Sequence, residues 1–597
     1  MTPLAPRFEW LVPAPVELSP ETLAAAADRN LSPRLMRALA RRGQWSAAEL
    51  LALVDNPEGA LHDPMLLPDA DRFRERVRRG VAANERFLVF GDFDADGLTG
   101  LAILTLALRR LGLDAEPYVP SRLDEGHGLS LAAVERARVE GRTVIVTVDC
   151  GTTSVAEVAA ARAVGIDVLI SDHHAIPEVL PDAAAIVNAH LPGSRYPDSR
   201  LSGAGIAFKL AQALLADEPL GPEYALGLVD LAAVGSVADM VPIAGENRAI
   251  LRLGLERLAT SARPGLAALL RAAGVDPARV DPEAIGYVVA PRINAVGRVG
   301  EALAAAQLLL AEDPADVERL AGELEAANVL RRELLAAALL EARNAALAEP
   351  ESGVLVLSGA WPVGVVGLVA GRLADELERP TVVFSTLVDP WRGSARSAGG
   401  FDLAQAFADC GDLFERFGGH PAAAGCHLAP ARYEEFRLRF AALAPAFAPR
   451  KAARPLRLDL VLRADSVDYV LLRELAPLEA GGEPPPMVGI AGFVVARVRA
   501  ASGGHTQLTL RRGNEVLDGI CFGRSDLVDT VGEGQVVDVV ARLSTRTFGG
   551  FESLQLDIRD VAPAGWLSGL RRRVTEPATS LGQDTVVDPT AVGAAAS

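Results

Sequence analysis

Cysteine is scarce in this 597-residue sequence, and its distribution argues against two kinds of site. The four cysteines, Cys150, Cys410, Cys426 and Cys521, lie far apart, and none belongs to a CxxC pair. Neither a structural zinc site nor a disulfide framework is therefore indicated. This pattern is typical of a protein of the reducing cytoplasm.

Long uncharged apolar segments are absent as well. No run reaches the ~18 residues of a membrane-spanning helix. The first residues, which include Arg7 and Glu9, contain no apolar core of a signal peptide. We therefore expect a soluble, cytoplasmic protein that has no membrane partner.

A third absence concerns ATP-driven motors, because the sequence contains no GxxxxGK[ST] motif and hence no P-loop. Lysine is rare too: only Lys209 and Lys451 occur, and the other basic residues are arginines. With 77 acidic and 59 basic residues, the formal net charge is −18. A nucleic-acid partner would therefore need a local basic groove, since phosphate contacts are electrostatic and local.

The most informative stretch is Phe87–Gly100, FLVFGDFDADGLTG. An apolar run of strand character ends in Asp92, Asp94 and Asp96, and Leu98–Leu111 then has the composition of an apolar helix. Three carboxylates this close together repel one another unless cations or hydrogen-bond donors compensate them. A divalent metal is the simplest compensation.

The pattern of an apolar run followed by an acid returns three times. VIVTVDCG places Asp149 at the end of an apolar run, DVLISDHH places Asp172, His173 and His174 at the end of another, and LAAVGSVADMVP places Asp239 after a fourth. In an open α/β sheet, ligands bind beyond the carboxyl ends of the strands. A lone DxD is equally compatible with a turn-capping acid, but four such clusters on one rim would destabilise the fold without a metal. We therefore predict one metal-binding rim.

The histidines of this rim have two interpretations. A lone histidine is usually a satisfied polar residue of the interior. Because His173 and His174 directly follow an acid at a strand end, we interpret them as one metal ligand and one donor that faces a phosphate.

The chain is long enough for three to five domains at ~100–200 residues each. From Phe87 to about Arg263, apolar strands alternate with Ala-rich helical segments, which is typical of a largely parallel sheet. We assign residues 46–300 to this domain. In residues 301–349 we predict a connecting helix over Ala315–Ala348, ~50 Å long at ~1.5 Å per residue.

Residues 350–446 contain a second α/β pattern, with VLVLSG, PTVVFS and WRGSARS, and with His420 in a glycine-rich turn, FGGHPAAAGCHL. Five strand-like stretches in residues 455–563 predict a small Greek-key barrel such as an OB-fold. Residues 1–45 have the character of an N-terminal appendage, and residues 564–597 have that of a disordered tail.

Two further motif matches do not hold. SGAGIAF superficially suggests a dinucleotide-binding loop, but Phe208 replaces the third glycine and nothing strand-like leads into it. DFDADG also resembles the DxDG motif of haloacid-dehalogenase phosphatases, whose first Asp is a nucleophile. That family would need a suitably placed lysine and a later GDxxxD acid pair, and the DHH triplet is foreign to it.

Taken together, FGDFDADG, VTVDCG, SDHH and GSVADMVP resemble the successive motifs of the DHH phosphoesterase superfamily. LSGAGIAFKL, RINAVGR, RGSARS, FGGHPAAAG and LAPLEAGGEPPPMV extend the similarity to its RecJ family of single-stranded-DNA exonucleases, over roughly residues 45–562. The sequence departs from the family at Phe93 and Ala95, where Tyr and Val are frequent, and at Pro362, where many relatives have His.

The resemblance implies a parallel-sheet DHH domain, joined by a long helix to a DHHA1-type domain and followed by an OB-fold. It also implies two divalent ions, preferably Mn²⁺ and otherwise Mg²⁺. Asp149 would bridge the ions, Asp96, His173 and Asp239 would complete one site, and Asp94 would hold the other. Mixed imidazole and carboxylate ligands suit Mn²⁺, and an incompletely filled second site leaves room for water and substrate.

The same resemblance implies the catalytic and substrate-binding residues. Asp149 is catalytic through the metals, and His174, oriented by Asp172, donates to the phosphoryl oxygens. Phosphates of the strand are contacted by Asn294, Arg298, Ser394, Arg396 and His420, and a 5′-terminal phosphate by Arg122.

Aromatic residues of the barrel are either core or stacking platforms for bases. We favour a core position for Phe493, leave Phe522 open between the two, and favour stacking for Phe548 and Phe551, which flank Gly549–Gly550 in a turn.

Three functions are compatible with the sequence. The leading one is a metal-dependent 5′→3′ exonuclease that degrades single-stranded DNA to mononucleotides in DNA repair and recombination, with a helicase and a single-stranded-DNA-binding protein as partners. Its direction and its DNA preference come from the resemblance. The second is a DHH phosphodiesterase for short oligonucleotides or cyclic dinucleotides. The third is a catalytically inactive DNA-binding relative.

Overall fold

The chain, in the computed structural model, forms two compact units, each described here by itself. The larger unit comprises residues 51–451 and 479–484, and the smaller unit comprises residues 1–50, 452–478 and 485–597. The structure describes residues 4–12, 17–42, 46–47, 50, 57–122, 125–348, 353–443, 454–480, 486–502, 504–513, 515–548 and 551–575.

A five-stranded parallel sheet organises the first half of the larger unit. Its strand order, β3-β2-β4-β5-β6, means that the chain runs from β2 outward to β3 and then returns past β2 to β4. The predicted parallel sheet is confirmed. The strands are β2 (Arg86–Gly91), β3 (Asp114–Tyr118), β4 (Val144–Val148), β5 (Asp167–Ser171) and β6 (Ala185–Val187).

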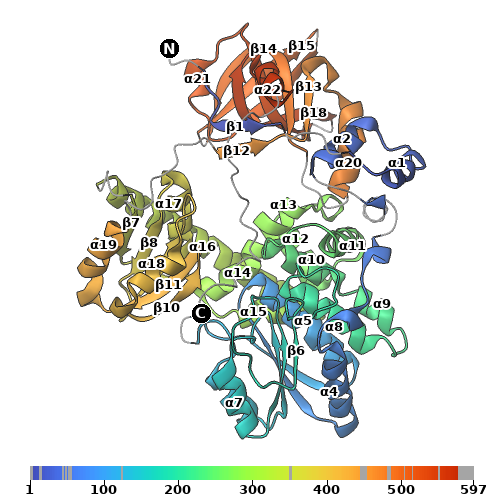
Figure 1. Ribbon diagram of the computed structural model, residues 1–597, viewed down its shortest axis with the longest axis vertical. Coiled ribbons are helices and arrows are strands. Elements are labelled where there is room, and N and C mark those ends of the chain that lie inside the picture. The colour runs from blue at the N-terminus through green and yellow to red at the C-terminus, as the bar shows by residue number, and fades with distance from the viewer. Residues whose placement is uncertain are drawn as a thin grey trace, which may run out of the picture. The chain divides into compact units, whose positions relative to one another are not determined.

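Helices cover both faces of this sheet (Figure 1). Helices α4 (Ala70–Ala83), α5 (Ala95–Arg110) and α8 (Gly203–Leu215) pack on one face, and α6 (Leu131–Val139) and α7 (Val155–Ala163) pack on the other. The strands are buried on both sides, which explains why their sequences are continuously apolar.

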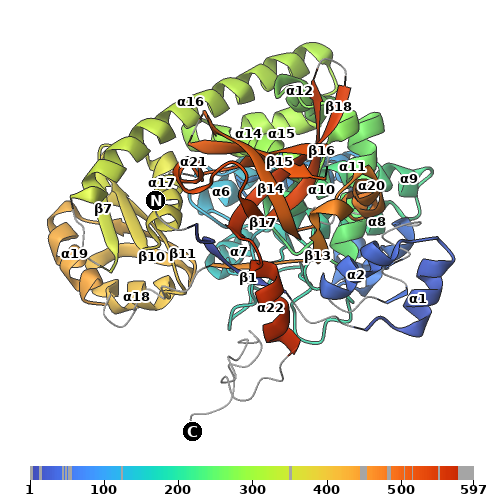
Figure 2. The same cartoon turned by 90° about the horizontal axis from the view of Figure 1, so that it is seen from above.

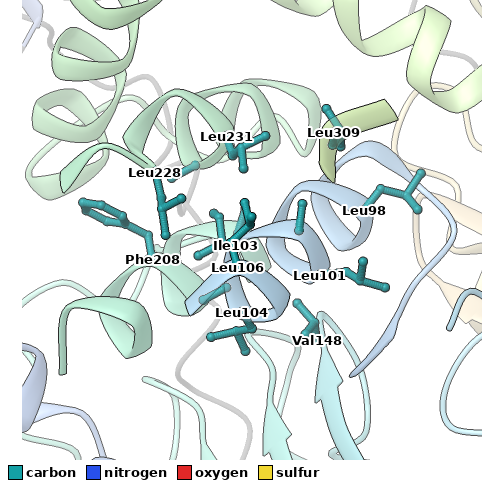
Figure 3. Packing of buried hydrophobic residues seen from close by; sticks show 14 of the residues in the cluster. Leu98, Leu101, Ile103, Leu104, Leu106, Val148, Phe208, Leu228, Leu231 and Leu309 are labelled. Carbon is teal, nitrogen blue, oxygen red and sulfur yellow. The ribbon is translucent and has the colours of Figure 1, made fainter. Parts of the chain in front are cut away.

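Helix α5 is the most deeply buried of these helices, since every residue from Ala95 to Leu108 is buried. Figure 3 shows its leucines packed between Val148 of β4 and a layer of helices that supplies Phe208 and Leu231. Each large apolar side chain buried in this way contributes roughly 1.5–3 kcal/mol. The core therefore holds the first turn of α5 firmly at the edge of the sheet.

Beyond β6 the first domain is helical, so the predicted alternation of strands and helices up to Arg263 is wrong after Val187. In particular, LAAVGSVADM forms helix α10 (Val229–Ala238) and not a strand. A short buried apolar run has the same pattern in a helix as in a strand. The other helices are α9 (Gly221–Leu226), α11 (Glu246–Ser261), α12 (Pro264–Ala272), α13 (Pro282–Ala284), the π-helical turn Ile285–Val289, α14 (Ala290–Val299) and α15 (Leu303–Leu310).

Helix α16 (Pro314–Leu347) has 34 residues and extends about 51 Å at ~1.5 Å per residue. The predicted connecting helix is therefore present, and α15 occupies part of the segment before it. Figure 2 shows α16 passing from α12 to β7. Leu320 and Leu324 belong to the core of the first domain, whereas Ala338 and Ala342 belong to that of the second. No helix in the described part of the chain is long and apolar enough to cross a membrane.

The second domain of the larger unit contains a mixed sheet with the order β10-β11-β9-β8-β7. One face packs on α18 (Leu403–Asp409) and α19 (Tyr433–Ala442), and part of the other packs on α16 and α17 (Val363–Leu377). The predicted second α/β domain is confirmed. Its strands are β7 (Leu355–Gly359), β8 (Thr381–Ser385), β9 (Trp391–Arg396), β10 (Phe414–His420) and β11 (Ala423–Leu428).

The smaller unit is built on a closed barrel, as predicted. Strands β14 to β18 pair in the order β14-β15-β16-β18-β17, and the pairing of β17 with β14 closes the sheet. The strands are β14 (Val488–Ala501), β15 (His505–Arg512), β16 (Glu515–Cys521), β17 (Val536–Phe548) and β18 (Phe551–Pro563), and β13 (Leu460–Arg463) joins along β14.

The N-terminal segment is part of the smaller unit. Strand β1 (Phe8–Leu11) pairs in parallel with β12 (Arg454–Arg457), and Trp10 packs in the same core as Leu567. Two further helices, α1 (Pro20–Ala27) and α2 (Pro33–Arg42), precede the larger unit in sequence. The tail differs from the expectation of disorder from residue 564, because α22 (Trp566–Thr575) packs Leu567 into this core. Residues 576–597 lie outside the described part.

A buried carboxylate connects the N-terminal segment to the barrel. Asp560, fully buried, accepts hydrogen bonds from Trp10 Nε1 at 2.8 Å and from the Phe8 backbone at 3.0 Å. The guanidinium of Arg524 lies 2.6 Å from the same carboxylate. We expect Asp560→Ala to lower the free energy of unfolding of this unit by about 3–5 kcal/mol, because it leaves Trp10 Nε1 and Arg524 Nη1 buried without their acceptor, although Arg524 keeps Asp526.

Urea denaturation of the full chain, followed by circular dichroism, tests this expectation. The control is Asp465→Ala, which removes an exposed carboxylate of the same unit and should change the free energy by no more than ~0.5 kcal/mol. Equal transitions for the two variants would contradict the stabilising role of Asp560.

Candidate active site

The acids that the sequence singled out gather at one edge of the parallel sheet. Asp92 follows β2, Asp149 follows β4, and Asp172 follows β5. Strands β2 and β4 are neighbours although β3 lies between them in sequence. In doubly wound sheets, such a reversal of strand order leaves a crevice at the carboxyl ends of the strands.

The loop after β2 fixes two carboxylates through backbone amides. Asp94 caps the N-terminus of α5 and accepts hydrogen bonds from the backbone nitrogens of Asp96 at 3.0 Å and Gly97 at 3.1 Å. Asp96 accepts from the backbone nitrogens of Gly203 at 2.7 Å and Ala204 at 2.9 Å. These two amides begin α8, where the helix dipole favours a negative charge.

Two glycines let the surrounding helices approach these carboxylates. A Cβ at Gly203 would lie 2.5 Å from Asp149 Cβ, and a Cβ at Gly235 would lie 2.6 Å from Asp96 Oδ1. Both distances are too short for real atoms. Any larger residue at either position would therefore displace a carboxylate of the site.

Asp149 lies at the centre of the group. Its backbone is in the left-handed region, with φ at 62°, and its side chain is buried. Burial, together with the nearby charges of Asp96 and Asp94, raises the pKa of Asp149 well above its usual value. Within the described residues Oδ1 accepts no hydrogen bond, although His173 Nε2 lies 3.0 Å away. An unpartnered buried oxygen of this kind is well suited to a cation.

The two histidines after β5 have different environments. The Asp172 carboxylate accepts hydrogen bonds from the His173 backbone nitrogen at 2.8 Å and from the Thr152 backbone nitrogen at 3.0 Å. It also lies 2.8 Å from His174 Nδ1. This contact with Asp172 raises the pKa of His174 to about 9. Burial instead lowers the pKa of His173. Despite its burial, Asp172 has a lowered pKa because of its bonds to His174 and Thr152.

Asp239 reaches the site from helix α10, whose last turn it caps. Its Oδ2 lies 3.7 Å from His173 Nε2, and Asp96 Oδ2 lies 3.8 Å from the same nitrogen. Burial, with the charges of Asp96 and Asp94, raises the pKa of Asp239 to about 7. Burial, with the charges of Asp92 and Asp96, raises the pKa of Asp94 to about 6. The site is thus electrostatically incomplete without cations.

The donor atoms fit divalent metal ions. Among the residues that the structure describes, three groups of potential ligands have all their donor atoms within 4.8 Å of one another. They are Asp96 with His173 and Asp239, Asp92 with Asp94 and Asp149, and Asp149 with His173 and His174. All five residues predicted as ligands belong to these groups. Carboxylate oxygens with one or two imidazoles form a set that suits Mn²⁺ and also accommodates Mg²⁺.

Sequence reasoning assigned no ligand role to Asp92 and did not consider His127. His127 Nδ1 lies 3.0 Å from Asp92 Oδ2, and its ring packs at 4.4 Å against that of Phe93. The place of Asp92 in the DxDxD series was a signal for the first omission. No local pattern in the sequence pointed to His127, which comes from the loop after β3.

The site opens into a cavity of about 770 Å³ between the two domains of the larger unit. Asp92, Asp149 and His174 line it from the first domain. The second domain contributes residues of strands β9, β10 and β11, among them Ser394 and His420. His420 ends β10 at the hairpin and is exposed, so it is the last residue of a strand and not part of the turn itself.

Three of the predicted arginines line this cavity, namely Arg122, Arg298 and Arg396. Burial lowers the pKa of each, and for Arg298 burial together with Arg122 brings the pKa to about 9. The Arg122 guanidinium stacks over the ring of Phe93 at 4.7 Å, and that of Arg396 donates to Ser394 Oγ at 3.3 Å. Buried guanidinium groups that repel one another are stabilised when a polyanion binds between them.

The remaining predicted residues lie elsewhere. Asn294 is half-buried on α14 and is not among the residues that line the cavity, although its Oδ1 lacks a hydrogen bond in the described part of the chain. In the barrel, Phe493 is fully buried, as favoured, and Phe522 is exposed. The backbones of Phe548 and Phe551 pair across a hairpin. Their side chains fall outside the described residues, so the stacking interpretation stays a prediction.

Three family models match the chain. The DHH family N-terminal domain matches residues 86–235, the DHHA1 domain residues 351–444, and the RecJ OB domain residues 458–560. The single-stranded-DNA-specific exonuclease RecJ of Bacillus subtilis is 32% identical over 94% of this chain and 72% of its own length. That of Dickeya dadantii is 34% identical over 89% of this chain and 96% of its own length.

Solved structures agree with these matches. RecJ from Thermus thermophilus in complex with Mn²⁺ is similar with a TM-score of 0.78 and 29% identity, over 94% of this chain and 81% of that chain. Its Mg²⁺ complex is similar with a TM-score of 0.73 and 27% identity, over 94% of this chain and 80% of that chain. The chain belongs to the RecJ family of the DHH superfamily, as its motifs indicated.

The raised carboxyl pKa values predict how metals stabilise the protein at different pH. Asp94 and Asp239 have pKa values raised from 3.8 to about 6 and about 7. In the metal-free protein, their stabilising contribution is complete below pH ~4 and is lost as the pH rises through ~6–7. Metals bind the deprotonated carboxylates. The increase in Tm caused by Mn²⁺ should therefore be small near pH ~5 and should grow up to pH ~8.

Thermal unfolding with Mn²⁺ and with a chelator, at several pH values, measures this difference. The variant Asp239→Asn is the matched comparison, because it removes one of the two titrating groups. An Mn²⁺ effect that is equal at pH ~5 and pH ~8 would contradict the assignment of these acids as ligands.

Proposed function

We propose that this protein is a divalent-metal-dependent exonuclease that degrades single-stranded DNA from the 5′ end to mononucleotides. The observation that supports this most directly is that linked carboxylate and histidine groups face an arginine-lined cavity. Hydrolysis of a phosphodiester is favoured when cations, such as metal ions and arginines, stabilise the negative charge that develops on the phosphoryl oxygens. Single-stranded DNA as the substrate comes from the names of the relatives. The direction comes from the motif resemblance.

The ligand groups divide naturally between two ions. Asp96, His173 and Asp239 would hold one ion, and Asp94 would hold the other, joined by Asp92. Asp149 would serve both, because its Oδ1 faces His173 and it also groups with Asp92 and Asp94. Divalent ions, once bound, polarise phosphoryl oxygens and lower the pKa of water.

His174 acts on the substrate as a donor. The Asp172 carboxylate, 2.8 Å from Nδ1, raises the pKa of His174 and orients its ring. Because His174 lines the cavity, Nε2 is free to donate to a phosphoryl oxygen on which negative charge develops. Asp172 is therefore the positioning residue and His174 the catalytic one.

The arginines of the cavity bind the end of the strand. A terminal phosphate monoester carries up to about two charges and an internal diester carries one, so two guanidiniums discriminate between them. Arg122 and Arg396, with Ser394, are the residues that we assign to the 5′-terminal phosphate. Arg298, Asn294 and His420 are assigned to neighbouring phosphates.

The parts of the chain then have separate tasks. Residues 46–300 carry out catalysis, residues 301–349 connect, and residues 350–446 bind phosphates. The barrel in residues 455–563 holds the strand, with Phe548 and Phe551 as stacking residues, and residues 1–45 complete the unit that contains it. We further propose a role in DNA repair and recombination in the cytoplasm, where a helicase and a single-stranded-DNA-binding protein supply the substrate.

Two other functions receive less support. A phosphodiesterase for short oligonucleotides or cyclic dinucleotides has no need of the barrel, because small substrates require no extended binding surface. A catalytically inactive DNA-binding relative has no need of a complete ligand set, yet every predicted ligand belongs to a group that could hold a metal.

Loss of the shared ligand should abolish cleavage. We expect Asp149→Asn to reduce the release of mononucleotides by at least ~100-fold, because it removes a carboxylate common to both ions. The assay uses a long single strand with Mn²⁺, labelled at either end. Release of labelled mononucleotide at the start from the 5′-labelled strand, and only at the end from the 3′-labelled strand, identifies the direction.

The control is Asp217→Asn, which neutralises an exposed carboxylate. It should cleave like the wild type. Near-normal turnover of Asp149→Asn would refute the metal assignment. Early release of the 3′ label would refute the direction.

The preference for a 5′ phosphate should depend on Arg396. Replacing Arg396 with Gln removes a charge-assisted contact of about 1.5–3 kcal/mol, which corresponds to about 10- to 150-fold in relative affinity for 5′-phosphorylated strands. Cleavage of 5′-phosphoryl and 5′-hydroxyl strands is compared at matched salt. The exposed Arg432→Gln, in the same domain, is the control. If Arg396→Gln keeps the full preference, Arg396 does not bind the end.

A further inference from the structure

One face of the second-domain sheet is only partly covered. Towards β7 and β8, helices α16 and α17 pack on it through Leu357 and Val383. Helix α17 also reaches β9, where a Cβ at Gly367 would lie 3.0 Å from Ser394 Oγ. Beyond it, residues of β9, β11 and β10 line the cavity. The opposite face of these same strands buries Ala395, Ala424 and Cys426 in an aromatic core. Alternation along the strands therefore directs the side chains of Arg392, His427 and Arg416 to the cavity side of the sheet.

The strand pairing places three basic side chains in one row across this open face. Arg416 of β10 is directly opposite His427 of β11, and His427 is directly opposite Arg392 of β9. All three line the cavity. We call them the Arg392–His427–Arg416 row. Burial, followed by the charges of Arg392 and Arg416, lowers the pKa of His427, so the three groups interact.

Arg392 and Arg416 are two strands apart, on β9 and β10, and face the same side of the sheet across His427 of β11, so their like charges repel. Within the described residues, no acidic side chain forms an ion pair with Arg392 or Arg416 that would relieve this repulsion. The row is separate from the arginines already assigned to the strand end, because Arg392 and Arg396 are four residues apart on β9. At ~3.3 Å per residue, the separation is about 13 Å.

The surface between the row and Arg396 has almost no side chains. Gly418, Gly425 and Ser394 form the next row along the same face. A Cβ at Gly418 would meet no atom within 4 Å, and a Cβ at Gly425 would meet only a backbone oxygen at 3.7 Å. A flat, open floor thus joins two groups of cations within one cavity.

We infer that the Arg392–His427–Arg416 row is a second phosphate-binding subsite, beyond the one formed by Arg396 and Ser394. A guanidinium group can bind two oxygens of one phosphate at the same time. A phosphate bound between Arg392 and Arg416 would replace their mutual repulsion with attraction to the shared anion. The glycine floor leaves room for the sugar and base that accompany the phosphate. This inference rests on the proposed function. The phosphate belongs either to the bound strand or to a free nucleoside monophosphate, such as the product.

The test is the double variant Arg392→Gln/Arg416→Gln of the full chain, with Arg432→Gln as the matched control. Binding of a 5′-phosphorylated single strand is measured by fluorescence anisotropy in the presence of a chelator, at several salt concentrations. If the row binds a phosphate of the strand, affinity falls at least ~10-fold. The slope of log K against log salt also decreases by ~0.7 for each phosphate that the variant no longer neutralises.

A second arm identifies the other source. Binding of thymidine 5′-monophosphate is measured by calorimetry for wild type and variant, also with the chelator. Weaker binding in this arm alone assigns the row to a free nucleotide, and weaker binding in the strand arm alone assigns it to the strand. Unchanged affinity in both arms overturns the inference. An equal decrease in Arg432→Gln overturns it as well, since the effect would then be one of net charge.

Two further measurements separate this inference from a folding defect and from the proposed function. The double variant should have a Tm at least equal to that of the wild type, because it removes two like charges from one face of the sheet. Gly418→Leu fills the open floor and should weaken binding of the same ligand whose binding the double variant weakens. If it does not, the inference fails. Both binding arms are free of metal, so a failure of cleavage would refute the proposed function without affecting them.

Discussion

Mutual repulsion of buried carboxylates is the constraint on which the active site depends. Asp94, Asp96, Asp149 and Asp239 meet where burial raises the pKa of three of them. The fold compensates part of this cost with backbone amides of α5 and α8, and it brings helices close to the acids through glycines. The rest is left to cations. On the proposed metal assignment, stability and metal binding are coupled, since the charges that repel one another are those that would bind the ions.

The arginines that line the cavity show the same effect of burial, but on positive charges. Arg122, Arg298 and Arg396 have pKa values lowered by burial, and Arg122 lowers those of the other two further through its charge. Helix α16 makes this arrangement possible, because one stripe of it belongs to the core of the first domain and another to that of the second. The acids and two of these arginines come from the first domain, and Arg396 comes from the second. Such a cavity is suited to a phosphate backbone that binds metals at one point and guanidiniums at others.

The sequence by itself determined the chemistry of the site and the class of fold. The apolar run, the acid and the following segment are contiguous, so a metal-binding rim could be predicted without knowledge of distant contacts. The individual roles of Asp94, Asp149 and His173 came from the family resemblance. The order of the motifs indicated the family, and the spacing of short strands indicated the barrel. The length of α16 was equally predictable, because no proline or glycine interrupts its pattern except Gly322.

Only the tertiary structure decided what depends on pairing between distant segments. Asp239 comes from the end of a helix and not of a strand, because a buried apolar run looks the same in both. His127 joins Asp92 through a loop 35 residues away. The N-terminal segment belongs to the barrel because Trp10 and Asp560 meet, although they are 550 positions apart. The Arg392–His427–Arg416 row depends on the strand register, which determines which residues of neighbouring strands are opposite each other. No single segment of the sequence contains this information.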